Sequence, residues 1–69
     1  MKIKRKTSSI VIIGNEILSG KTLDTNSNYI AKKLRTKGIK CNSIKVIPDD
    51  EKVIVKTINN LKKSNDYIF

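Results

Sequence analysis

The sequence of 69 residues contains no histidine and no tryptophan, and it has one cysteine, one proline and three glycines. The absence of histidine excludes imidazole catalysis and the ordinary zinc sites that use histidine. A single cysteine, Cys41, excludes an internal disulfide. Because no base or helix start lies near it in the sequence, we interpret Cys41 as a half-buried strand residue rather than a nucleophile. A chain this short without disulfides or metal forms at most one small domain with a modest core.

Long apolar runs are also missing, and no window approaches the length needed to span a membrane. The basic start MKIKRK resembles the first part of a signal peptide. However, the apolar run that follows, from Ile10 to Ile13, is too short to continue one. We therefore expect a cytoplasmic protein with no membrane partner.

Acidic residues are scarce, since six Asp and Glu stand against fifteen Lys and Arg, which gives a formal net charge of +9. Such a charge can attract nucleic acid. The chain is also rich in Ile and Asn, and this joint enrichment with Lys is typical of coding from an AT-rich genome. Nucleic-acid modules usually add stacking aromatics, and only Tyr29, Tyr67 and Phe69 are present. We expect solvated lysines and no nucleic-acid partner, and keep a small basic nucleic-acid-binding protein as the alternative.

The acids that are present gather behind two apolar runs. Glu16 and Asp24 follow the first run, and Asp49, Asp50 and Glu51 directly follow the second. If both runs are parallel strands, five of the six acids lie at one edge of the sheet, where ligands bind in open α/β proteins. Acids at helix starts also complement the helix dipole, which accounts for Asp50 and Glu51 but poorly for Glu16.

Hydrophobic periodicity predicts five elements in the order β-α-β-α-β after a basic arm at residues 1–7. They are a strand at Ser8–Ile13, a helix from Asp24 or Thr25 to about Lys37, a strand at Lys40–Ile47, a helix from Asp49 or Asp50, and a strand from Asp66 to Phe69. A loop covers residues 14–23. This order predicts an α/β fold with a parallel sheet.

Punctuating residues support these boundaries. Gly38 is well placed as the left-handed residue that ends the first helix, with Ile39 touching Leu34. Pro48 ends the second strand because it has no N–H to donate. An apolar stripe at Ile54, Ile58 and Leu61 gives the second helix its inner face.

Three motifs in order carry a resemblance. They are GNEILSG at Gly14–Gly20, DTN at Asp24–Asn26 and PDD at Pro48–Asp50. Together with the NDYIF ending, they resemble the molybdopterin-binding domain family, closest to the branch of the N-terminal domain of competence/damage-inducible protein A. The resemblance covers residues 8–69.

The resemblance implies a sheet order of 2-1-3 within a three-layer domain. It also implies that the chain is the N-terminal β-α-β-α-β half, truncated after the third strand. In the family that strand runs into a Thr-Gly-Gly loop and a Gly-Pro-Thr-x-Asp-Asp segment, and this sequence stops before both. We therefore expect a fragment holding roughly the first 40% of the domain, with residues 8–69 incomplete at the C-terminus.

The resemblance also implies a ligand site after the first two strands. Its ligand-binding residues would be Gly14, Asn15, Glu16, Gly20, Asp24, Asn26 and Asp50. Asp49 would be the catalytic carboxylate beside a metal-bound phosphate. Glu16, Asp24 and Asp49 would be the oxygen ligands of a hydrated Mg²⁺, an ion that keeps waters and bridges phosphates.

Several of these residues have a simpler interpretation. Gly14, which we expect to allow a sharp backbone turn, could merely end a strand, and Asp24 could cap a helix while also binding a ligand. Asn26 could be a polar residue of the capping region, and Asp50 fits a cap better than a ligand contact. Lys21 fits an exposed lysine better than a phosphate contact. Gly20 is expected to adopt a positive φ.

The intact domain would act on a phosphoanhydride ligand with Mg²⁺. Its partner would be a phosphorylated small molecule, either molybdopterin or a nucleotide such as ADP-ribose. The resemblance implies that intact relatives are molybdopterin adenylyltransferases or nucleotide pyrophosphatases and are often homo-oligomers. We expect the fragment alone to be inactive. An inactive gene remnant that unfolds with weak cooperativity is a further alternative.

Overall fold

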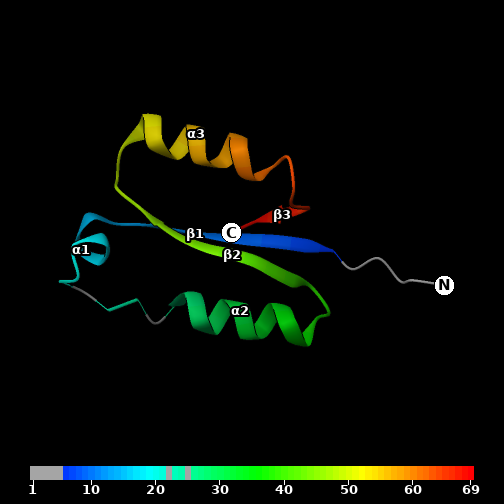
Figure 1. Ribbon diagram of the computed structural model, residues 1–69. Helices are drawn as coiled ribbons and strands as arrows, with labels where there is room; N and C mark the ends of the chain where they lie inside the picture. The colour runs from blue at the N-terminus through cyan, green and yellow to red at the C-terminus, as the bar shows by residue number, and fades with distance from the viewer. Residues whose placement is uncertain (1–5, 22, 25) are drawn as a thin grey trace.

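The computed structural model describes residues 6–21, 23, 24 and 26–69 (Figure 1). Its elements are β1 (Thr7–Ile13), α1 (Asn15–Leu18), α2 (Asn26–Thr36), β2 (Lys40–Ile47), α3 (Glu51–Leu61) and β3 (Tyr67–Ile68). The three strands form one parallel sheet in the order β2-β1-β3. The predicted α/β class, parallel sheet and 2-1-3 order are therefore confirmed.

The two longer helices lie on opposite sides of the sheet. Figure 1 shows α2 below the strands and α3 above them, so the chain has three layers. None of the helices in the described ranges is long and apolar enough to cross a membrane. The long connections between the parallel strands are the helical crossovers that such strands require.

The pairing of β1 with β2 contains a bulge. Ser8 pairs with Cys41 and Ser9 with Ser43, so Asn42 is an extra residue in β2. Both serines are fully buried. Ser8 Oγ donates to the carbonyl of Lys40 at 3.0 Å, and the Ser9 and Ser43 hydroxyls are 2.9 Å apart. Burial of these hydroxyls is tolerated because each has a partner.

The β3 strand is short but its pairing continues to the last residue. Phe69 N–H donates to the carbonyl of Ser9 at 3.0 Å, and Val11 N–H donates to the carbonyl of Phe69 at 2.8 Å. Asp66 comes before the strand, not within it as predicted. Its Oδ2 accepts from the Thr7 N–H at 2.8 Å and fixes the start of β3 against the start of β1.

The end of α2 has the predicted geometry. Gly38 has a φ of +76°, and its N–H donates to the carbonyl of Arg35 at 3.1 Å. The next N–H, that of Ile39, donates to the carbonyl of Leu34 at 2.9 Å. These two bonds are the Schellman pair, and the positive φ favours glycine at this position. The chain then enters β2 at Lys40, the predicted residue.

The core is small. Among the described residues the buried apolar side chains are Ile10, Leu34, Ile47 and Leu61. Ile10 lies at the centre of the middle strand, while Leu34 and Leu61 come from the helices on either side. The predicted inner stripe of α3 is buried only in part, because the Ile58 side chain stays 39% exposed. Cys41 is half-buried, as predicted.

Candidate functional site at the carboxyl ends of β1 and β2

Two hydrogen bonds join the segments that follow β1 and β2. The Gly14 N–H donates to the carbonyl of Ile47 at 3.1 Å, which extends the ladder past the end of β1. The Asn15 side-chain oxygen then accepts from the Asp49 N–H at 3.2 Å. The first and third sequence motifs, 34 positions apart at this contact, are thus held together by Asn15.

The segment after β1 is not the plain loop that the sequence predicted. Residues Asn15–Leu18 form the single turn α1, with Leu18 N–H donating to the carbonyl of Gly14 at 3.1 Å. It ends like α2, since Lys21 N–H donates to the carbonyl of Glu16 at 2.8 Å and Gly20 has a φ of +83°. The positive φ expected of Gly20 is confirmed. The helix was missed because one turn is too short for a periodic pattern.

Gly14 lies between the end of β1 and the start of α1, and its backbone conformation does not require glycine. Its φ of 170° is extended, a conformation open to any residue. What is unusual is the approach of Glu16, whose Oε1 lies 2.8 Å from the place that a Cβ on Gly14 would occupy. The carboxylate of Glu16 is therefore folded back over Gly14. A side chain at position 14 would displace that carboxylate rather than strain the backbone.

Asp24 caps α2, which confirms the simpler of its two interpretations. Its Oδ1 accepts from the N–H groups of Asn26 at 3.0 Å and Ser27 at 3.2 Å, and Oδ2 accepts from the Ser27 hydroxyl. The hydrogen bond from the Ser27 side chain, with those from the two N–H groups, lowers the pKa of Asp24 below its ordinary value of 3.8. Thr25, the other cap considered, lies outside the described residues.

Sequence reasoning missed Ser27 in this role. It is buried at 7% exposure on the inner side of α2, and it is the partner that uses the second oxygen of Asp24. The spacing of Asp24 and Ser27, three positions apart at a helix start, is the signal that could have found it. Asn26, between them in the first turn, is exposed and gives its N–H to Asp24.

Asp50 caps α3 and Asp49 does not. The Asp50 Oδ1 accepts from the N–H groups of Lys52 at 2.9 Å and Val53 at 3.3 Å, as its capping interpretation predicted. The side chain of Asp49 is exposed beside it, and its backbone N–H is held by Asn15. Of the two neighbouring carboxylates, only that of Asp50 accepts from the helix N–H groups.

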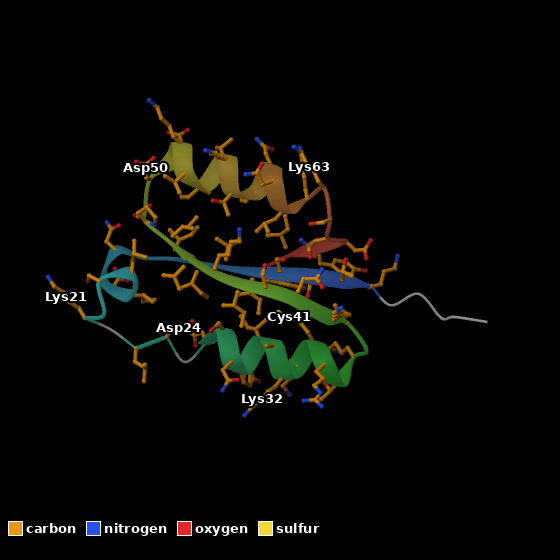
Figure 2. All side chains as sticks on the ribbon, viewed as in Figure 1. Lys21, Asp24, Lys32, Cys41, Asp50 and Lys63 are labelled. Carbon is orange, nitrogen blue, oxygen red and sulfur yellow. The ribbon has the colours of Figure 1, made fainter. Side chains whose placement is uncertain are left out.

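The predicted acids share one end of the molecule but not one cluster. Figure 2 shows Lys21, Asp24 and Asp50 at the same end, with Asp24 on the α2 side of the sheet and Asp50 on the α3 side. In the part of the chain that the structure describes, no three acidic or thiol groups lie close enough to hold a metal ion. The predicted set of Glu16, Asp24 and Asp49 is therefore not assembled as a three-carboxylate metal site.

Two surface hollows lie away from these residues. One, of about 640 Å³, runs along the outward side of α3. The other, of about 290 Å³, lies at the end of α2 and the start of β2, opposite the carboxyl edge. It is lined by Ala31, Arg35, Gly38, Ile39, Lys40 and Cys41. Neither hollow contains a residue predicted for ligand binding.

The fold defines a class, namely open α/β domains with a parallel sheet in which the first strand is central. Within that class the chain belongs to the family described as a probable molybdopterin-binding domain, which matches residues 9–69. The family resemblance drawn from the three motifs is confirmed.

Individual relatives agree with this assignment. The chain is 40% identical over 65 residues to a probable FAD synthase of Caenorhabditis elegans, covering 94% of this chain and 12% of that protein. It is 43% identical over 63 residues to a CinA-like protein of Thermosipho melanesiensis, covering 91% of this chain and 16% of that protein. It therefore spans less than one fifth of the length of either relative.

A solved structure shares the fold. The crystal structure of the protein CinA from Thermoplasma acidophilum, described as having unknown function, superposes with a TM-score of 0.87 at 30% identity. The match covers 93% of this chain and 38% of that chain. The likeness to CinA-type proteins, expected from the GNEILSG motif, is thus found in both sequence and structure.

Proposed function

We propose that the segments after β1 and β2, with Glu16 and Asp49, supply one side of a binding site for a phosphorylated pterin or nucleotide. One observation carries the proposal, the hydrogen bond by which Asn15 holds Asp49 beside the segment that contains Gly14 and Glu16. It brings two family motifs together at the carboxyl edge of the sheet, where α/β domains bind such ligands. Family membership supports a pterin, and the similarity to a probable FAD synthase supports a nucleotide.

The residues have separate parts in this proposal. Glu16 and Asp49 present exposed carboxylates from the two joined segments, and Asn26 presents an exposed amide from the first turn of α2. Asp24 and Asp50 act indirectly, because they cap the helices whose starts flank the site. Gly14 leaves space for the folded-back carboxylate of Glu16, and Gly20 shapes the end of α1.

We propose that Mg²⁺ binds at this site with two protein carboxylates instead of the three that the sequence predicted. A phosphate and two carboxylates repel one another unless a cation lies between them. Mg²⁺ is commonly held by one or two carboxylates together with the phosphates of the ligand, so a three-carboxylate cage is unnecessary. Glu16 and Asp49 are the two residues that we assign to it, since the carboxylate of Asp24 is occupied by α2. Bound there, the ion would neutralise phosphate charge.

For the 69 residues we propose binding rather than turnover. Asp49 is the residue that we assign to phosphoanhydride chemistry in a domain that carries the remainder of the fold. The 69 residues match only 38% of the solved CinA chain, so the binding proposal does not depend on this assignment.

The test is a nuclear magnetic resonance titration of the ¹⁵N-labelled chain with ADP-ribose, with and without Mg²⁺. We expect shift changes that centre on the amides of Gly14, Asn15, Glu16 and Asp49 and that grow when Mg²⁺ is added. Asp49→Asn should weaken binding, whereas Glu51→Gln should leave it unchanged. Glu51→Gln is the matched control, because this substitution also removes one negative charge, two positions from Asp49, at a residue that is not part of the proposed site.

Shift changes spread evenly over the lysines, or an equal effect of the two variants, would contradict the proposal. If Mg²⁺ does not affect binding, the proposed ligand site would stand, but the proposal that Mg²⁺ binds there would be wrong.

A further inference from the structure

The outward side of α2 carries an aromatic ring among positive charges. Tyr29, Lys32, Lys33 and Thr36 recur at the spacing of one helix face, and all four are exposed. The opposite side of the same helix holds the buried Ser27 and Leu34. Figure 2 shows the Lys32 side chain directed away from the sheet. We call these four residues the α2 outer face.

The tyrosine ring on this face is paired with a cation instead of being buried. Its side chain is 60% exposed, and the Lys33 Nζ lies 5.6 Å from the ring centroid. This is within the range of a cation–π contact, which keeps a positive charge beside the ring. The sequence alone did not predict whether Tyr29 faces the core or the solvent, because tyrosine is common in both environments.

The charge of this helix is of one sign. From Asn26 to Thr36 there are three basic residues and no acid, and Lys37 follows directly. The acids of the chain lie instead between β1 and α2, between β2 and α3, in the first turn of α3 at Glu51, and at Asp66. The α2 outer face therefore attracts anions without a neighbouring carboxylate on the same helix to oppose it.

We propose that the α2 outer face binds single-stranded nucleic acid, with a base stacked on Tyr29 and phosphates held by Lys32 and Lys33. An exposed ring among cations is the arrangement that sequence-tolerant single-strand binding uses. A duplex hides the faces of its bases, so a single strand is the better occupant. The surface is separate from the proposed small-molecule site, which lies at the carboxyl ends of β1 and β2.

The experiment measures fluorescence anisotropy of a labelled oligothymidylate of about 12 nucleotides, a length within the range of small single-strand sites. Wild-type protein should bind it more tightly than a duplex of the same length. Tyr29→Ala should weaken binding about tenfold with little change in the salt dependence, because stacking is lost and charge is kept.

The charge contribution is tested with two matched double variants. Lys32→Gln with Lys33→Gln should reduce the slope of log K against log salt by about 1.4, since each phosphate contact on a single strand contributes about 0.7. Lys52→Gln with Lys56→Gln removes the same charge from α3, on the other side of the sheet, and should change the slope far less. Thermal unfolding of each variant checks that it is folded.

Equal slopes for the two double variants would overturn the proposal, because binding would then reflect only the net charge of +9. A duplex bound as tightly as the single strand, or Tyr29→Ala binding like wild type, would also overturn it. So would binding to phosphatidylserine vesicles without binding to the oligonucleotide, which would identify a membrane surface as the occupant.

Discussion

Asp24 shows what one carboxylate does at a helix start in this protein. Both of its oxygens are used, by two N–H groups and by the Ser27 hydroxyl, and these bonds favour the charged form. The pKa of Asp24 is lowered in the folded chain for that reason. The unfolded chain therefore binds a proton more readily at this residue than the folded one does.

The Asp24→Asn variant should reveal this linkage. A lowered folded pKa contributes stability that is fully present above the ordinary value of 3.8 and is lost as the pH falls through the folded value. We expect the variant to be less stable than wild type at pH 7, and the difference to shrink below about pH 4. Urea unfolding between pH 3 and 7 measures it. A stability difference that does not change with pH would contradict the account.

Single residues with a stereochemical role were the most predictable from the sequence. Gly20, Gly38 and Asp50 each have the predicted conformation or partner, because positive φ and helix capping are local requirements. The role of Asn15 was not predictable in detail. Its partner is a backbone N–H 34 positions away, and no local pattern encodes that distance.

Among the elements, α2 and α3 owe their ends to a few residues. The Asp50→Ala variant should lower the free energy of unfolding by about 1 kcal/mol, because two N–H groups of α3 lose their acceptor. Asp49→Ala is the matched control and should change it by less than about 0.5 kcal/mol, as an exposed residue that does not cap. Urea denaturation compares them, and equal losses would show that the lost charge, not the cap, is what matters.

The glycines at the ends of β1 and α2 should respond differently to a methyl group. Gly38→Ala should cost about 1 kcal/mol, because alanine is strained at a φ of +76° although the space around it is open. Gly14→Ala should cost less, since φ is 170° there and only the flexible Glu16 carboxylate must move. Thermal unfolding of the two variants tests this order, and a larger loss for Gly14→Ala would contradict it.

Elements with a full periodic pattern were found from the sequence and short ones were not. The β2 strand has its predicted bounds, and α2 lies within its predicted range. The single turn α1 and the shortness of β3 were missed, because hydrogen bonds to Gly14, Thr7 and Ser9 set them rather than side-chain periodicity. The bulge at Asn42 was also not predicted, because it depends on how the residues of β2 pair with those of β1.

At the scale of the whole molecule, the order of strands followed from the family resemblance, while the assembly of the acids did not. Three motifs fixed the topology because connections between parallel strands allow few arrangements. They did not fix the distances between carboxylates, which depend on the conformations of the segments after β1 and β2. Asp24 ended on one side of the sheet edge and Asp50 on the other (Figure 2).

The whole chain should become more stable as salt is added. A net charge of +9 on 69 residues makes the compact state repel itself, and salt screens this repulsion. Raising NaCl from 10 to 150 mM shortens the screening length from about 30 to about 8 Å and should raise Tm by several degrees. Sucrose at matched osmolality is the control for effects that are not electrostatic. A Tm that is independent of NaCl would show that the lysines are too far apart to repel.

The central position of β1 has a consequence for biosynthesis. This strand is made first, yet its two neighbours in the sheet come from residues 40–47 and 67–68, and the bond from Thr7 to Asp66 spans 59 positions. The apolar segment from Ile10 to Ile13 therefore leaves the ribosome long before either flank can cover it. Until the residues of β2 and β3 have been synthesised, we expect this exposed apolar segment to bind chaperones that protect hydrophobic segments from aggregation.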